Sequence, residues 1–378
     1  MNSALSLLRE LVEIPTVSSL SNRPLVEYAA KIMHECGWQS RTYPYFDSAG
    51  IEKINVIAIP PGQDPSDRAI ELAFVCHTDT VPYDPAWNEA IHPALRGGFL
   101  HGCGACDVKG FLASLLAALL ELKPANYHRS ICIVLTADEE VGCVGASKLI
   151  AAQAIAPRHV VVGEPTSLRP ARAGKGYCLA EIKVFGREAH SAHPSEGASA
   201  IFRAARLILK IEEIGSLLRN EHHNFFEPPF STVNIGTIQG GSAKNIVPGE
   251  CRFLLEWRPI PGQDTRQVVY ALERAVEEIQ VKDPDFRVEV TTLRDQPGFD
   301  AGANSCLVQS LERITGRPSL AIPFASEANL FSQLAQDIVV FGPGDMRTAH
   351  SSRECVSVVE LTECASNLRE LMISPLAI

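Results

Sequence analysis

The sequence has no excess of positive charge and no long uninterrupted apolar run. Among its 378 residues, 34 Lys and Arg stand against 44 Asp and Glu, which gives a net charge of -10. Because phosphates are bound by a cationic face, this balance argues against nucleic acid as a partner. The most apolar segment, residues 110–122, is far shorter than the roughly 20 residues that cross a bilayer, so we expect no membrane association either.

The sequence also lacks the features of an exported, disulfide-bonded chain. Residues 1–10 have no basic region, and Arg9 and Glu10 interrupt their apolar pattern, so we expect no signal peptide. The 11 cysteines are scattered and odd in number, which is typical of reduced thiols in a cytoplasmic protein. Cys103 and Cys106 could form a redox or zinc-ribbon pair, but no second pair follows at ribbon spacing, and we interpret both as small loop residues.

Four short apolar runs each lead into histidine or carboxylate side chains. Runs of this kind, bounded by turn residues, predict buried strands. The runs cover residues 70–76, 131–137, 159–163 and 338–342, and the polar residues that follow them are His77, Asp79, Glu139, Glu140, Glu164 and His350. Because ligands collect at the carboxyl ends of strands in open α/β sheets, we expect these side chains to form one site.

The order of the predicted elements indicates two domains. Helices and strands alternate over residues 1–170, which predicts a mainly parallel sheet covered on both faces. Residues 171–290 follow the order strand, helix, two strands, helix, strand, which is typical of a ferredoxin-like α+β unit. The first pattern returns over residues 291–378. We therefore expect an α/β domain in two parts with a smaller α+β domain inserted into it.

Each histidine and aspartate of this set has a plain structural interpretation beside the functional one. His77 could be a loop histidine bonded to backbone, but Asp79 two residues later is placed to orient its imidazole, as carboxylates do beside metal ligands. Asp107 precedes a buried Ala/Leu-rich helix, so it is either a cap stabilised by the helix dipole or a ligand. His350 by itself is only a loop histidine.

The glutamates are harder to explain structurally. Glu139 and Glu140 are adjacent after an apolar strand, where two carboxylates repel unless they share a cation or a proton. Glu164 follows three valines, and an unpaired charge would be costly there.

Taken together, two histidines and three carboxylates suit two divalent ions of zinc type, with one carboxylate bridging them. Such ions, about 3.5–4 Å apart, can share a water, lower its pKa and polarise a carbonyl. One remaining carboxylate would then be the general base that carries the proton to a leaving nitrogen. This chemistry predicts hydrolysis of an amide or a peptide.

Five co-linear motifs resemble those of the M20 metallopeptidase and amidohydrolase family. They are His77-Thr78-Asp79, Gly102-x-Gly104-x-x-Asp107-x-Lys109-Gly110, Asp138-Glu139-Glu140-x-Gly142, Gly163-Glu164-Pro165-Thr166 and Ala349-His350. The resemblance implies that the α/β domain is catalytic and holds two Zn²⁺ or Co²⁺ ions. It implies these roles: Asp107 bridges both ions, His77 and Glu164 complete one site, Glu140 and His350 complete the other, Glu139 is the base, and Asp79 orients His77.

The inserted domain resembles the family's lid, which also forms the dimer in dimeric members. Residues 186–194 match the lid segment whose first histidine, here His190, reaches the active site and stabilises the tetrahedral intermediate. His193 is interpreted as a bystander. By the same resemblance, Asn245 and Arg258 bind a substrate carboxylate, for which arginine's fork geometry is suited, although Arg258 could also be a solvated strand residue. The resemblance therefore implies a homodimer.

Within the family, the chain most resembles the acetylornithine deacetylase branch. Residues 16–22 look like the N-terminal segment of that branch, and residues 325–328 resemble its Gly-Thr-Glu-Ala stretch. Glu327 could then face the cationic amine of the substrate, or be a salt-bridged surface residue. The chain departs from the branch at Asn329, where proline is usual, and at Trp257.

The branch implies deacetylation of N2-acetyl-L-ornithine in arginine biosynthesis. Three alternatives stay open. One is deacylation of another N-acyl amino acid, such as N-acetylcitrulline or N-succinyl-diaminopimelate. The second is a dipeptidase or carboxypeptidase on the same scaffold, and the third is an inactive binding protein that keeps only the fold.

Overall fold

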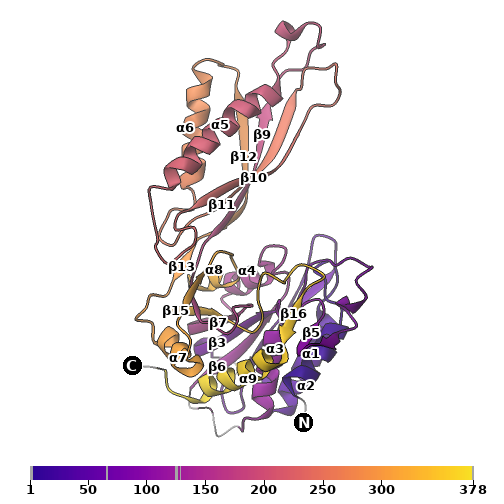
Figure 1. Ribbon diagram of the computed structural model, residues 1–378, viewed down its shortest axis with the longest axis vertical. Coiled ribbons are helices and arrows are strands. Elements are labelled where there is room, and N and C mark those ends of the chain that lie inside the picture. Colours follow the sequence, from indigo (N-terminus) through magenta and orange to yellow (C-terminus); the bar gives the residue numbers. More distant parts are fainter. Residues whose placement is uncertain (1–2, 65–66, 124–126, 128, 377–378) are drawn as a thin grey trace. The chain divides into compact units, whose positions relative to one another are not determined.

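The chain divides into two compact units (Figure 1). The computed structural model describes residues 3–64, 67–123, 127 and 129–376, so the first two residues of the predicted non-signal segment lie outside the described residues. Unit 1 comprises Met1–Ala173, Asp300–Leu320 and Ser326–Ile378, and unit 2 comprises Gly174–Phe299 and Ala321–Ala325.

Unit 2 continues past residue 290, where the sequence predicts the inserted segment to end. The reason is strand β12 (Arg287–Gln296), which pairs with β9 (Tyr177–Phe185) from Arg287 through Gln296. Its exposed residues carry no apolar run that would mark its length in the sequence.

Unit 1 is built on a sheet whose centre is parallel. Its strands are β1 (Gln39–Phe46), β2 (Glu52–Ile59), β3 (Ala69–His77), β6 (Ile131–Thr136), β7 (Ala156–Gly163), β8 (Ala171–Gly174), β13 (Phe299–Asp300), β14 (Leu320–Ile322) and β15 (Asp337–Phe341). Their order is β1-β2-β6-β3-β7-β15-β8-β13, and β14 pairs with β8. β3 is parallel to β6 and β7, and β7 is parallel to β15, whereas β1, β2 and β8 pair antiparallel.

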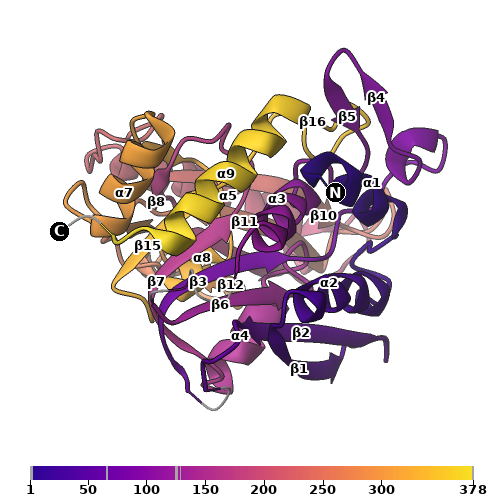
Figure 2. The ribbon, with the colours of Figure 1, turned by 90° about the horizontal axis from the view of Figure 1, so that it is seen from below.

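Helices cover both faces of this sheet, because alternate residues of its central strands are buried on opposite sides. The helices of unit 1 are α1 (Ala4–Glu13), α2 (Arg23–Glu35), α3 (Lys109–Leu120), α4 (Val144–Ala151), α7 (Cys306–Thr315), α8 (Ala328–Phe331) and α9 (Val358–Ile373). The main core packs one sheet face against α1, α2, α3, α7 and α9, and α3 and α9 lie side by side (Figure 2). α4 and α8 contact each other on the other face.

The fold class predicted from the sequence is confirmed. The four apolar runs form β6, β3, β7 and β15, which are neighbours in that order. The Ala/Leu-rich helix is α3, and nearly all of its side chains are buried, as its low charge predicts. Among the described residues, no helix is both long and apolar enough to cross a membrane.

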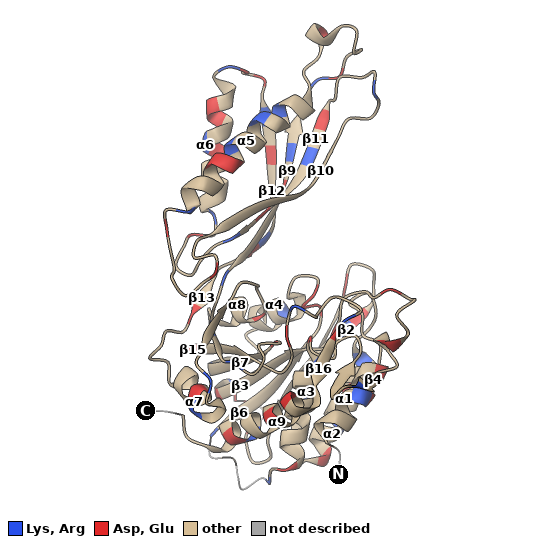
Figure 3. Cartoon of the chain, viewed as in Figure 1, with Lys and Arg blue, Asp and Glu red and all other residues tan. Residues whose placement is uncertain are grey.

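Unit 2 is a four-stranded antiparallel sheet with two helices. Its elements are β9, α5 (Ala200–Leu218), β10 (Thr232–Gly240), β11 (Glu250–Arg258), α6 (Gln267–Gln280) and β12. The sheet order is β10-β11-β9-β12, which is the ferredoxin-like arrangement. One sheet face packs on α5 and α6, and acidic and basic residues are both distributed over these elements (Figure 3).

Three short strands form a separate small sheet, and two 3-10 turns complete the described elements. These are β4 (Ala94–Arg96), β5 (Phe99–His101) and β16 (Cys355–Ser357), in the order β16-β5-β4, with turns at Asn88–Ala90 and Pro194–Glu196. By pairing with β5, β16 holds the chain that follows His350 beside the loop that leads to Asp107.

Candidate active site

The carboxyl ends of the central strands bring the predicted side chains together. His77 is the last residue of β3, Glu164 directly follows β7, and Glu139 and Glu140 follow β6. Because these strands are hydrogen-bonded neighbours, their ends meet at one edge of the sheet. His350 reaches the same place from the loop after β15.

Asp107 lies at the centre of this group. Its Oδ1 is 3.1 Å from Nε2 of His77, and its Oδ2 is 3.0 Å from Nε2 of His350. The same His350 nitrogen is 3.2 Å from Oε1 of Glu140. Each oxygen of one buried carboxylate therefore faces a different imidazole, which is the arrangement of a carboxylate that bridges two cations.

Electrostatic forces in this cluster are strong because it is buried. Burial acts to lower the pKa of His77, but its hydrogen bond with Asp107 and the nearby acidic charges raise that pKa well above its usual value. Hydrogen bonds with Asp107 and Glu140 raise the pKa of His350 to about 11.

The glutamates of the cluster resist ionisation. Burial, with added repulsion from Glu140, raises the pKa of Glu139 to about 8. Burial also raises the pKa of Glu164 well above its usual value, and the charge of Asp107 adds to this effect. Several carboxylates in one buried site are unfavourable unless positive charge is supplied.

The donor set fits two divalent cations of zinc type. Ligand atoms of His77, Asp107 and Glu140 all lie within 4.8 Å of one another. Imidazole and carboxylate are ligands that zinc accepts, and the two histidines stand on opposite oxygens of Asp107. Glu164, on the strand next to His77, supplies a further carboxylate.

Asp79 holds the backbone of the loop that carries Glu139 and Glu140, and it also contacts the imidazole of His77. Its carboxylate accepts hydrogen bonds from the backbone N–H groups of Glu139 (3.0 Å) and Glu140 (3.2 Å) and from the hydroxyl of Ser18 (2.7 Å). Nδ1 of His77 is 3.1 Å from the backbone oxygen of Asp79 and 3.7 Å from its carboxylate. The contact that the sequence predicts to orient His77 is thus made chiefly by the backbone oxygen of Asp79 and less by its carboxylate.

Glu354 is a buried acid that sequence reasoning missed. Its Oε1 accepts hydrogen bonds from the backbone N–H groups of both Cys106 and Asp107, each 3.1 Å long. Burial and the charge of Asp107 raise its pKa to about 7. The only signal in the sequence is that Glu354 follows His350 by four residues, which does not distinguish it from a surface glutamate.

Two site segments adopt left-handed backbone conformations. His350 has a φ of 56° and Asp138, directly before the glutamate pair, has a φ of 58°. Non-glycine residues hold this conformation only where their surroundings compensate its cost. Around Asp138, the compensation comes from the Tyr45 hydroxyl (2.9 Å) and the ammonium of Lys53 (3.0 Å).

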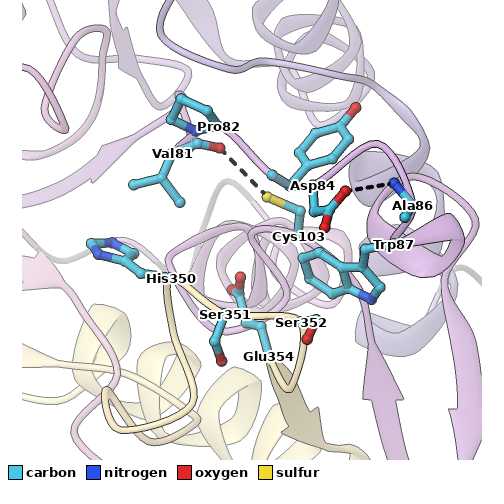
Figure 4. A pocket seen from close by; sticks show the side chains of 11 residues that line it. Val81, Pro82, Asp84, Ala86, Trp87, Cys103, His350, Ser351, Ser352 and Glu354 are labelled. Carbon is cyan, nitrogen blue, oxygen red and sulfur yellow. Dashed lines mark hydrogen bonds between the residues drawn. The ribbon is translucent and has the colours of Figure 1, made fainter.

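A cavity of about 580 Å³ opens beside His350 within unit 1 (Figure 4). Tyr83 and Trp87 stand edge to face in its wall, with ring centroids 6.4 Å apart. Its lining comprises Val81, Pro82, Tyr83, Asp84, Ala86, Trp87, Cys103, His350, Ser351, Ser352 and Glu354. It is large enough for an acylated amino acid, and it offers both aromatic surface and a carboxylate.

The remaining predicted residues lie in unit 2. His190 forms a β-bridge with Ile246, and the N–H of Ser191 donates to the backbone oxygen of Asn245 (3.0 Å), so His190 and Asn245 belong to paired, exposed segments. Arg258 donates to Glu256 (2.8 Å). Its guanidinium also lies over the ring of Tyr177.

Glu327 is placed differently from both interpretations of the sequence. It is fully buried, so the surface glutamate is wrong, and it offers no exposed face to a substrate amine. Its Oε2 accepts a hydrogen bond from Thr136 (2.9 Å), while Oε1 has no partner. Burial raises its pKa to about 7. The sequence misleads because the short segment around Glu327 has no regular apolar periodicity that would mark it as buried.

Comparisons with known proteins agree with this site. Residues 73–374 match Peptidase family M20/M25/M40. The chain is 44% identical to an acetylornithine deacetylase of Myxococcus xanthus over 96% of this chain and 94% of that protein. It is 30% identical to another acetylornithine deacetylase, from Photorhabdus laumondii, over 94% and 92%.

Solved structures share the fold at lower identity. A tripeptidase from Staphylococcus aureus has a TM-score of 0.78 at 22% identity, covering 98% of this chain and 96% of that one. A metallo-carboxypeptidase from Sulfolobus solfataricus has a TM-score of 0.76 at 18% identity, covering 98% and 99%. With its motifs, its fold and its buried cluster of histidines and carboxylates, this chain belongs to peptidase family M20/M25/M40.

Proposed function

We propose that this protein is a metal-dependent amidohydrolase that converts N2-acetyl-L-ornithine to L-ornithine and acetate, a reaction of arginine biosynthesis. The observation that carries the proposal is the buried cluster around Asp107, in a chain 44% identical over nearly its full length to an acetylornithine deacetylase. The cluster supports hydrolysis, and the relatives support the substrate.

Five side chains would hold two divalent ions, Zn²⁺ or Co²⁺. In this proposal, Asp107 bridges the ions, His77 and Glu164 complete one site, and Glu140 and His350 complete the other. When bound, such ions lower the pKa of a water and polarise the acyl carbonyl. The chain's own part is to fix the ligands, through the backbone hydrogen bonds that Asp79 and Glu354 accept.

Glu139 is the proposed general base. Its loop is anchored by the N–H bond to Asp79, and its carboxylate accepts a hydrogen bond from the thiol of Cys143 (3.3 Å). In this role it removes a proton from the attacking water and delivers it to the nitrogen of the departing ornithine. The cleaved bond is the amide C–N bond, and the acyl part leaves as acetate.

Substrate recognition is proposed for residues of unit 2 and, separately, for a cavity of unit 1. In unit 2, His190 would stabilise the developing oxyanion, and Asn245 and Arg258 would bind the substrate's carboxylate. In unit 1, the cavity beside His350 carries Asp84, and this exposed carboxylate suits the cationic side chain of ornithine better than the buried Glu327 does.

Unit 2 is also the proposed dimerisation domain of a cytoplasmic homodimer. In support, α5 exposes four large apolar side chains, Ile201 at 39%, Phe202 at 75%, Leu209 at 60% and Leu217 at 66%. Exposed apolar groups on one element favour an interface between copies. Sedimentation of the full chain tests this part, which requires a two-chain species.

The catalytic proposal is tested by removing and returning metal. Protein treated with a chelator should release no ornithine from N2-acetyl-L-ornithine, and Zn²⁺ or Co²⁺ should restore the release. Mg²⁺, which demands octahedral oxygen ligands, serves as the control and should restore little. Full activity in the chelated protein, with its metal content verified as nil, would overturn the proposal.

A further inference from the structure

A second group of metal-type ligands lies in unit 1, away from the cluster around Asp107. It consists of His159 on β7, Asp337 at the start of β15 and Cys306 at the start of α7. Ligand atoms of all three lie within 4.8 Å of one another. His159 stands five residues before Glu164 on the same strand, which corresponds to about 16 Å of extended chain.

The topology explains why these residues meet. β7 and β15 are parallel neighbours, and His159 and Asp337 are register partners, so their side chains leave the same face of the sheet. The helix α7 packs on that face through Leu307, Val308 and Leu311. Its first residue therefore brings the thiol of Cys306 to the two strand residues.

The distances match the edges of a small tetrahedron. Nδ1 of His159 is 3.2 Å from Oδ2 of Asp337, and Sγ of Cys306 is 3.3 Å from the same oxygen. For zinc bonded at about 2.0 Å to nitrogen and oxygen and about 2.3 Å to sulfur, tetrahedral angles separate the ligand atoms by about 3.3–3.5 Å. These two edges are close to the spacing that a bound cation needs, and all three ligand atoms lie within 4.8 Å of one another.

One ligand atom lacks a partner in this group. His159 is only 3% exposed, and its Nδ1 is a buried nitrogen with no hydrogen bond of acceptable geometry, although Asp337 is close. A cluster without a cation would leave that nitrogen without a well-directed hydrogen bond, which costs free energy because the atom is buried. A cation bound between the three residues removes this cost and explains why the three ligand atoms lie close together.

The surrounding charges do not oppose a cation. The charges of Arg158 and Glu71 act on His159 in opposite directions, and Arg158 donates to the side chain of Gln336 (3.0 Å). A Cys–His–Asp set with one remaining position for water is a zinc-type donor set, because the thiolate and imidazole favour zinc over magnesium or calcium.

We propose that His159, Cys306 and Asp337 form a second, structural site for one Zn²⁺-type ion that joins α7 to β7 and β15. On binding, the thiol of Cys306 loses its proton to solvent, and the thiolate, imidazole and carboxylate bind the ion. The site is independent of the proposed deacetylase reaction, because none of its residues lies in that cluster.

Cobalt spectroscopy tests this site without reference to activity. Sulfur-to-cobalt charge transfer gives a near-ultraviolet band, and the proposed catalytic ligands include no cysteine. Co²⁺-loaded protein should show this band, and Cys306→Ser should lose it together with one equivalent of bound metal. Cys36→Ser, which removes another partly exposed thiol, is the matched control and should keep both. Absence of the band in the unsubstituted protein, or its persistence in Cys306→Ser, overturns the proposal.

A second measurement needs no variant. Zn²⁺ should slow alkylation of Cys306 by iodoacetamide at least tenfold, as read from peptide masses, while Cys36 reacts at an unchanged rate. Equal rates for Cys306 with and without Zn²⁺ contradict the site, even where the proposed catalytic cluster binds metal normally.

Discussion

Two carboxylates of the site each accept hydrogen bonds from two backbone N–H groups. Asp79 accepts the N–H groups of Glu139 and Glu140, and Glu354 accepts those of Cys106 and Asp107. Buried N–H groups need such acceptors, and a fixed backbone holds the side chains that it carries. The geometry of the ligands thus depends on acids that need not touch a metal.

Replacement of Glu354 tests this positioning role. Glu354→Ala removes the acceptor of two backbone N–H groups, and we expect it to weaken metal binding about 10–100-fold. Glu354→Gln keeps one oxygen in the same place and should retain affinity close to that of the unsubstituted protein. Zn²⁺ titration against a chromogenic chelator measures both. Equal losses in Ala and Gln would mean that the charge matters, not the hydrogen bonds.

Replacement of Glu139 tests the general base. Glu139→Gln preserves size and the backbone bond to Asp79, but it cannot accept a proton, so we expect kcat to fall about 10²–10⁴-fold. Bound metal should stay unchanged, because Glu139 is not among the proposed ligands. Steady-state kinetics with metal analysis of the same sample provides the check, and an unchanged kcat would remove Glu139 from this role.

At this scale the sequence predicts best the residues that end strands, and it does not predict the burial of two glutamates that stand elsewhere. The apolar runs before His77, Glu140 and Glu164 mark a common sheet edge, and the structure brings their ends together. Glu354 and Glu327 are buried by the tertiary packing of short irregular segments, which carry no periodic signal. Burial of a lone glutamate is therefore invisible before the fold is known.

Among the elements, α3 and β7 set the position of Glu164. A Cβ on Gly163 would lie 2.2 Å from the ring of Phe111 on α3, so only glycine permits this close packing. Gly163 at the end of β7 and Phe111 on α3 are therefore closely packed against each other.

Gly163→Ala should destabilise the chain by about 1–3 kcal/mol through overpacking, and it should also weaken metal binding by displacing Glu164. A matched control is Gly236→Ala on β10, where the nearest atom to a new Cβ is 3.7 Å away, and its cost should stay within about 0.5 kcal/mol. Urea unfolding measures both variants. If the two variants had equal free energies of unfolding, β7 would be able to move away from Phe111, and the packing argument would be wrong.

In unit 2, α5 is tied to the turn after α6 by an ion pair. Asp283 accepts hydrogen bonds from Arg203, which is buried, and from Arg206. The hydrogen bond from Arg203 lowers the pKa of Asp283 below its usual value. A folded-state pKa below the unfolded one stabilises the fold above the unfolded pKa of about 3.9, and this stability is lost as pH falls through the folded pKa.

Asp283→Asn should therefore cost about 1.5–3 kcal/mol at pH 7, and the difference should shrink below about pH 4. Asp285→Asn is the control, because the side chain of Asp285 is 78% exposed, and it should change little at any pH. Hydrogen exchange of α5 peptides during urea unfolding provides the measurement. A cost for Asp283→Asn that is constant with pH would contradict the argument.

Elements with a strong apolar pattern could be predicted, and weakly patterned ones could not. The buried and exposed residues of β9 alternate, a pattern that the sequence itself carries. β1 is a largely exposed edge strand, and β4, β5 and β16 contain three residues each, so none of these four has enough apolar periodicity to mark it.

On the scale of the whole molecule, the proposed roles divide between two units. Unit 1 holds the cluster around Asp107 and the cavity beside His350, and unit 2 holds His190, Asn245 and Arg258. The sequence predicts this division because the element order changes twice along the chain. The sequence does not reveal that the segment Ala321–Ala325 also belongs to unit 2, because five residues are too few to form a recognisable pattern.

The central claim is the substrate, and specificity constants test it most directly. For the zinc-loaded protein, kcat/KM should be compared for N2-acetyl-L-ornithine, N-acetylcitrulline, N-succinyl-diaminopimelate, N-acetylmethionine and several dipeptides. We predict that N2-acetyl-L-ornithine exceeds each of the others at least tenfold, because Asp84 favours a cationic side chain. A higher kcat/KM for a neutral acyl amino acid or a dipeptide would contradict the proposed deacetylation while leaving the metal-dependent hydrolysis in place.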